Sequence, residues 1–138
     1  MKDSDEFSIL KKVFTNLGNQ YFDSSNLLIG PGDDAGLFKS NKELIYSTDT
    51  SVVNVHFPED LEAKLIAFRA CAVATSDIAA CGGSLKWLSI SLTTSSKNGK
   101  WIEDFSKGIK KFSDSYKVPI IGGDLTLGKE LSVSIGVC

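Results

Sequence analysis

Three segments of the chain have apolar residues spaced three or four positions apart, which predicts amphipathic helices. The first lies before Gly18, and its apolar positions are Phe7, Leu10, Phe14 and Leu17, with Ile9 and Val13 at the edge. The second spans residues 60–81, and its apolar positions are Leu61, Leu65, Phe68, Ala72 and Val73. The third spans residues 101–116, with Trp101, Phe105, Ile109 and Phe112. We expect each helix to bury this face.

Two other segments alternate between apolar and small polar residues, the pattern of a half-buried strand. They span residues 87–93 and 131–137. Shorter apolar runs predict four further strands, at residues 27–29, 35–38, 44–49 and 118–121. This order of helices and strands favours an α+β fold, in which helices cover one face of a mixed sheet of about four main strands.

Composition narrows the class of protein. The chain has 138 residues, of which 42% are hydrophobic and 23% charged. This composition is expected for a single domain with a buried core, and we assign residues 1–138 to that domain. A formal net charge of -2 argues against nucleic acid or a membrane as a partner. No apolar run approaches the roughly 20 residues needed to span a bilayer, and the polar start is unlike a signal peptide. We therefore expect a cytoplasmic protein.

The three cysteines, Cys71, Cys81 and Cys138, form no Cys-x-x-Cys pair. An odd number without that spacing argues against a disulfide framework or a zinc knuckle and predicts small buried thiols. The chain stops at Cys138 directly after a predicted strand, so we expect it to be a fragment of a longer protein.

Acidic residues recur where predicted strands end. Asp33 and Asp34 follow one strand in a glycine-rich loop, Asp49 ends another, and Asp124 follows a third after two glycines. Asp77 lies in an otherwise apolar helix, where a charge needs a partner. Carboxylates that meet at one rim repel each other unless a cation joins them. Magnesium is the natural cation for oxygen ligands that also hold phosphate.

Other interpretations of these residues remain open. Glycine followed by aspartate is common in turns, and Asp77 fits the end of a helix. Glycines beside the acids would let backbone N–H groups approach a phosphate: Gly30, Gly32, Gly122 and Gly123. No Walker A or Gly-x-Gly-x-x-Gly motif is present. His56 is either an ordinary hydrogen-bonded histidine or a donor to an anionic ligand.

Six short motifs occur in a fixed order: Gly30-Pro31-Gly32-Asp33-Asp34-Ala35, Ser47-Thr48-Asp49-Thr50, His56-Phe57, Ser76-Asp77-Ile78-Ala79-Ala80, Trp87-Leu88 and Gly122-Gly123-Asp124. This series resembles the amino-terminal domain of the thiamine-monophosphate kinase family, which is related to aminoimidazole ribonucleotide synthetase and selenophosphate synthetase. Each motif is weak alone, whereas the ordered set is specific. The resemblance covers nearly the whole chain.

The resemblance implies a set of magnesium ligands: Asp34, Ser47, Thr48, Asp49, Asp77 and Asp124. It implies that His56 contacts the thiamine phosphate and that Gly123 and Asp124 belong to the ATP site. The sequence does not separate Asp33 from its neighbour Asp34, and one of the two orients the loop. No side chain is assigned as a catalytic base. In the reaction that the resemblance implies, a phosphate group of the substrate accepts the phosphoryl group. The second pKa of a phosphate is about 6, so this group is largely ionised at neutral pH and needs no base.

The resemblance also implies that ATP phosphorylates thiamine monophosphate to thiamine diphosphate with Mg²⁺ present, and that two copies pair their sheets into a β-barrel. We expect the carboxy-terminal domain usual in the family to lie outside this fragment, and Leu127 stands where arginine is frequent. The alternatives are another superfamily member, such as a hydrogenase-maturation or purine-synthetase relative, and a non-catalytic fragment that dimerises and binds magnesium-nucleotide.

Overall fold

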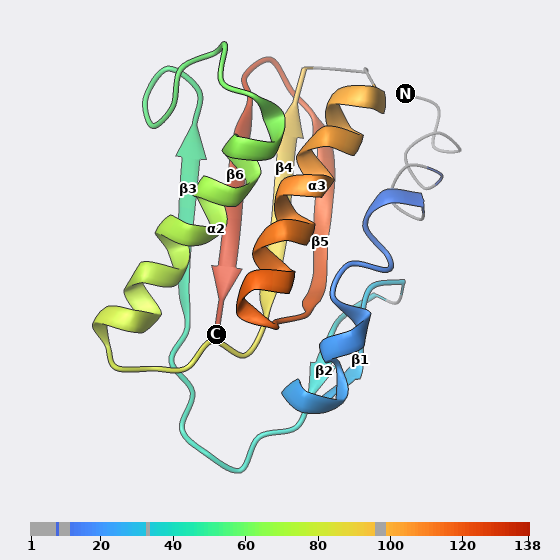
Figure 1. The fold of residues 1–138 in the computed structure, drawn as a ribbon, viewed down its shortest axis with the longest axis vertical. Helices are drawn as coiled ribbons and strands as arrows, with labels where there is room; N and C mark the ends of the chain where they lie inside the picture. The colour runs from blue at the N-terminus through green and yellow to red at the C-terminus, as the bar shows by residue number, and fades with distance from the viewer. Residues whose placement is uncertain (1–7, 9–11, 33, 96–98) are drawn as a thin grey trace.

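The computed structural model describes residue 8 and residues 12–32, 34–95 and 99–138, and its centre is a four-stranded sheet with two helices on one face (Figure 1). The strands are β3 (Ser47–Val52), β4 (Leu88–Thr94), β5 (Ile120–Leu127) and β6 (Ser132–Val137), and the helices are α2 (Ala63–Ala80) and α3 (Gly99–Tyr116). A smaller sheet pairs β1 (Leu27–Ile29) with β2 (Leu37–Phe38), after the 3-10 turns η1 (Asn19–Tyr21) and η2 (Asp23–Ser25).

The strand order of the main sheet is β3-β6-β4-β5. β6 runs antiparallel to both of its neighbours, whereas β4 and β5 are parallel and are joined by α3. A parallel pair needs a crossover of this kind. The predicted α+β fold with a mixed four-stranded sheet and helices on one face is therefore confirmed, and β3 and β5 are its two edges.

The two faces of the sheet differ in chemistry. The helix-covered face carries apolar side chains of β4 and β6, which form the core with Phe105, Ile109 and Phe112 of α3. The opposite face, here called the open face, carries the alternate positions, which are mostly hydroxyl residues and glycines. They are Thr48, Thr50, Val52, Ser89, Ser91, Thr93, Gly122, Asp124, Thr126, Ser132, Ser134 and Gly136. The alternation seen in the sequence thus describes both faces correctly.

The face by which α2 packs differs from the prediction. Leu65 and Val73, expected in the core, are exposed, while small residues take the buried positions. These are Ala63, Ala67, Ala70, Cys71 and Ala74, together with Ile66 and Ile78. The reason is the close approach of α3, because a Cβ on Gly108 would lie only 2.1 Å from the carbonyl oxygen of Lys64. Small side chains permit that approach and larger ones do not.

Two strand boundaries also differ from the prediction. The strand expected at residues 44–49 begins at Ser47, so Asp49 lies inside β3 and not at its end. The strand expected at residues 118–121 runs as β5 through Gly122-Gly123-Asp124 to Leu127. In both cases ladder pairing with a neighbouring strand outweighs the local turn signal of polar residues and glycines.

Part of the first predicted helix, including Phe7, Ile9 and Leu10, lies outside the described residues. Of its other apolar positions, Leu17 is buried, and Val13 and Phe14 pack against the core. No helix in the described ranges is long and apolar enough to cross a membrane.

Candidate functional site

Three of the predicted ligands gather where β3 faces the carboxyl-terminal part of α2. The Ser47 hydroxyl donates a hydrogen bond to Oδ2 of Asp77 at 2.8 Å. Asp49 lies two residues further along the same strand, so its side chain projects on the same, helix-covered face. Asp49 is opposite Ile135 of β6 and is half-buried. These three residues are called the β3 half-site below.

A second group lies at the other edge of the sheet and is called the β5 half-site: Asp34, Gly123 and Asp124. Asp124 projects from the open face of β5, where its Oδ2 accepts a hydrogen bond from the Thr126 hydroxyl at 2.8 Å. Asp34 lies in the loop that joins β1 to β2, two residues before Gly36, which packs against Ile121 of β5. A Cβ on Gly123 would lie 1.9 Å from the Ile90 carbonyl oxygen, so that position requires glycine.

The expected convergence of the acids on one rim does not occur within one chain. β3 and β5 are separated by two strands, a distance of about 14 Å at ordinary strand spacing. Asp49 and Asp124 also project from opposite faces. Within the described ranges, no three His, Cys, Asp or Glu side chains lie close enough together to hold a metal ion. Sequence reasoning failed here because strand ends and strand interiors look alike when polar residues occupy both.

Two further predicted residues take separate positions. The Thr48 side chain lies on the open face, where its hydroxyl donates to the Tyr46 hydroxyl at 2.6 Å. Its side chain therefore points away from Asp49, leaving only its backbone on the β3 half-site. His56 lies beyond the far end of β3, in a turn after Asn54, whose φ is 60°.

The hydrogen bonding of His56 determines which ring nitrogen is free to donate. The Val52 N–H donates to His56 Nδ1 at 3.0 Å, so Nδ1 is an acceptor. In a neutral ring the other nitrogen, Nε2, then carries the proton. His56 is exposed, so Nε2 is available to an anionic ligand.

The donor set of the β3 half-site fits magnesium chemically. Its donors are two carboxylates and a hydroxyl, all hard oxygen ligands. Magnesium is usually bound through one or two protein carboxylates while phosphates and waters complete its shell. The Cys71 thiol does not compete for this role, because burial raises its pKa to about 12.

Residues 32–138 match the family model described as AIR synthase related protein, N-terminal domain. The chain belongs to this family. The match covers every element from β2 onward, including both half-sites. Of the six motifs, all but the first two residues of Gly30–Ala35 lie within the matched residues, and they are distributed over the main sheet, helix α2 and the connecting loops.

Known relatives are more specific than the family model. The chain is 37% identical over 134 residues to the thiamine-monophosphate kinase of Buchnera aphidicola subsp. Schizaphis graminum (strain Sg), covering 96% of this chain and 40% of that protein. The thiamine-monophosphate kinase of Stenotrophomonas maltophilia K279a superposes with a TM-score of 0.80 at 31% identity, over 94% of this chain and 40% of that one. The chain thus spans about two fifths of the length of these relatives.

More distant structures share the fold alone. AaThiL, solved in complex with AMPPCP and TMP, has a TM-score of 0.64 at 22% identity, over 95% of this chain and 39% of that one. The hydrogenase maturation protein HypE, solved with ATP, has a TM-score of 0.66 at 19% identity, over 92% and 38%.

Proposed function

We propose that this chain is the amino-terminal, nucleotide-binding domain of a thiamine-monophosphate kinase, which transfers a phosphoryl group from ATP to thiamine monophosphate. The observation that carries the proposal is the 37% identity to a named kinase across 134 residues, a span that contains both half-sites. The relatives extend well beyond this chain, so a complete enzyme would include a further domain. A cytoplasmic location remains part of the proposal.

The chemistry requires few special side chains. The acceptor phosphate is already largely ionised near neutral pH, so no general base is needed. The difficulty is to bring two polyanions together in line. Magnesium, when bound, supplies positive charge to the phosphates. In this proposal Asp49 and Asp77 hold their oxygens toward that cation, Ser47 fixes the orientation of Asp77, and the Thr48 carbonyl completes this side.

The remaining residues act on the ligands. Gly123 contributes its backbone to the nucleotide phosphate site in this proposal, while Asp124 and Asp34 face the metal from the β5 edge. His56 Nε2–H donates to the phosphate of the thiamine substrate. The hydrogen bond from the Val52 N–H to Nδ1 supports the assignment, because it leaves Nε2 as the ring nitrogen that can donate to a phosphate.

The separation of the half-sites supports a dimer. The β3 half-site and the β5 half-site lie at opposite edges of one sheet. A single chain therefore does not bring the six proposed magnesium-binding residues together around one magnesium-nucleotide. We propose that two open faces pack together into a β-barrel, which places the β3 edge of one copy near the β5 edge of the other. Each site would then draw residues from both copies.

Two alternatives remain. The fold similarity to HypE favours a hydrogenase-maturation relative as the second enzyme candidate. A chain that binds magnesium-nucleotide without turnover is the non-catalytic alternative, supported by Leu127 at the position where arginine is frequent in the family. A turnover assay with thiamine monophosphate as acceptor separates these from the kinase.

The direct test is calorimetric titration of a non-hydrolysable ATP analogue into the chain, with and without Mg²⁺. Substitution Asp49→Asn preserves side-chain size but removes the charge, so we expect at least about a tenfold loss of magnesium-dependent affinity with an unchanged melting temperature. Asp60→Asn is the matched control, because Asp60 is exposed and lies before α2, away from both half-sites. Equal affinity in Asp49→Asn and wild type would remove Asp49 from the site.

A further inference from the structure

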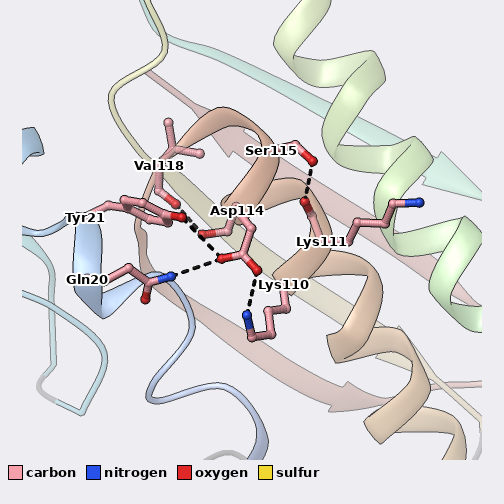
Figure 2. Close-up of polar contacts among 8 residues, drawn as sticks. Gln20, Tyr21, Lys110, Lys111, Asp114, Ser115 and Val118 are labelled. Atoms are coloured by element: carbon pink, nitrogen blue, oxygen red, sulfur yellow. Dashed lines mark hydrogen bonds and ion pairs between the residues drawn. The ribbon is translucent and has the colours of Figure 1, made fainter.

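The carboxylate of Asp114, near the end of α3, receives hydrogen bonds from two separate parts of the chain (Figure 2). Gln20 Nε2 donates to Oδ1 at 3.0 Å, and the Tyr21 hydroxyl donates to the same oxygen at 3.3 Å. Lys110, one helical turn earlier, pairs with Oδ2 at 2.6 Å. Both oxygens therefore have partners, and Oδ1 connects η1 to α3 across more than ninety positions of sequence.

The backbone beside this contact is closely packed. Gly18 immediately precedes η1 and has a φ of 75°, a conformation that favours glycine. A Cβ there would lie 2.8 Å from both Pro119 Cα and Ser113 Oγ. The Ser113 hydroxyl is buried and donates to the Val118 carbonyl at 2.6 Å. The turn from α3 into β5 thus packs closely against the start of η1 and fixes its position.

The same segment then reaches the acidic loop. Phe22, next to Tyr21, covers Gly30 so closely that a Cβ on Gly30 would lie 2.4 Å from the ring. The Leu27 N–H donates to the Phe22 carbonyl at 3.1 Å, which fixes the start of β1 relative to η1. After the loop, a Cβ on Gly36 would lie 2.8 Å from the carbonyl oxygen of Ile121 in β5. The loop that contains Asp34 is therefore supported at both of its stems.

We propose that Asp114 is a positioning residue: its carboxylate ties η1 to α3, and through Phe22 and Gly30 it holds the Asp34 loop beside the glycines of β5. This inference rests on the proposed function, because it assigns to the Asp34 loop a role in binding magnesium-nucleotide. Asp114 itself touches neither metal nor nucleotide.

The same helix offers an internal comparison. Asp104 pairs with Lys107 at 2.6 Å, the same distance as Asp114 to Lys110, and its side chain is 38% exposed against 40% for Asp114. Surface pairs of this kind contribute little to stability. The difference is that Asp114 also accepts two hydrogen bonds from η1, whereas the hydrogen bond to Asp104 comes from its own helix.

The first arm of the test does not depend on any ligand. Amide hydrogen exchange is measured in wild type, Asp114→Ala, Asp114→Asn and Asp104→Ala. Loss of the acceptor in Asp114→Ala should speed exchange over residues 20–32 by about fivefold or more, as removal of a charge-assisted hydrogen bond implies. Asp114→Asn keeps one carbonyl oxygen and should show a smaller change. Asp104→Ala should leave this segment unchanged, and an unchanged segment in Asp114→Ala would overturn the tether.

The second arm links the tether to the site. Asp114→Ala should weaken magnesium-dependent binding of a non-hydrolysable ATP analogue by about threefold to tenfold, with Asp104→Ala as the control. In an Asp34→Ala background the same change should have no further effect, because the loop no longer carries the ligand through which Asp114 acts. Additive effects of the two substitutions would overturn this link. If wild type does not bind the analogue, the proposed function fails, while the exchange arm still decides the tether.

Discussion

Ser47 shows how one hydroxyl can orient a carboxylate before any cation binds. Its hydrogen bond holds one oxygen of Asp77 toward β3, on the face from which Asp49 also projects. A preoriented oxygen loses less conformational entropy when it binds, so in the proposed magnesium site this hydrogen bond would raise affinity without an additional charge. Asp77 is exposed, so its charge late in an alanine-rich helix carries no burial cost, and the hydrogen bond from Ser47 sets its orientation.

At the residue scale, the cysteines allow a sharp prediction. The structure gives three free thiols, of which Cys71 and Cys138 are buried and Cys81 is exposed. With its pKa raised to about 12, Cys71 has only about 10⁻⁴ of its population as thiolate at pH 8. A thiol reagent at that pH should therefore label one cysteine quickly in the folded chain and three after unfolding.

Cys81→Ser provides the control for this measurement. The variant should lose the fast phase and keep the two slow ones. Fast labelling of Cys71 in the folded variant would contradict the packing of α2, because Cys71 is fully buried in the core that α2 forms with α3 and the sheet.

At the scale of elements, the sequence predicts those that follow a simple period and fails where the packing partner decides. The alternation in β4 and β6 and the aromatic stripe of α3 follow directly from residue type. The buried face of α2 cannot be predicted in this way, because nearly every turn of that helix has apolar residues on more than one side. The close approach of α3 at Gly108 decides which side is buried, since only small residues fit there. The candidate acids were found by type, but their arrangement depends on strand order, which no local pattern encodes.

The α2–α3 contact leads to a prediction about stability. Gly108→Ala should lower the free energy of unfolding by about 1–3 kcal/mol or more, because the added methyl group meets the Lys64 carbonyl on the neighbouring helix. Gly99→Ala is the matched control in the same helix, since its Cβ would have no atom within 4 Å. Alanine favours helix, so this control should be neutral or slightly stabilising. Urea unfolding followed by circular dichroism would measure both, and equal stabilities would contradict the close packing.

For the whole molecule, the arrangement of the half-sites matters more than either one alone. One chain carries the proposed oxygen ligands at both edges of its sheet, with hydroxyls and glycines between the edges on the open face. Neither group has the number of ligands expected of a site that positions two phosphate esters. If the proposed dimer forms, a second copy would bring together the two groups that one chain keeps apart.

The dimer itself is testable by sedimentation. We expect wild type to sediment as a dimer, and Ser134→Glu, which places a charge near the middle of the open face, to shift it toward monomer by at least about tenfold in dissociation constant. Lys111→Glu, on the exposed side of α3, is the control and should not change association. A wild-type chain that is monomeric at every concentration would rule out the barrel.

The hydroxyl-rich open face has a consequence for how such an interface could arise. A hydroxyl both donates and accepts, so a surface made of serine and threonine is complementary to its own copy, whereas a charged surface meets like charge across a two-fold axis. Asp124 is the one charged residue among the twelve positions of this face. The face is therefore compatible with water when the chain is alone and with itself when two chains meet. Two identical copies can therefore associate through this face without a separate patch of opposite charge on each copy.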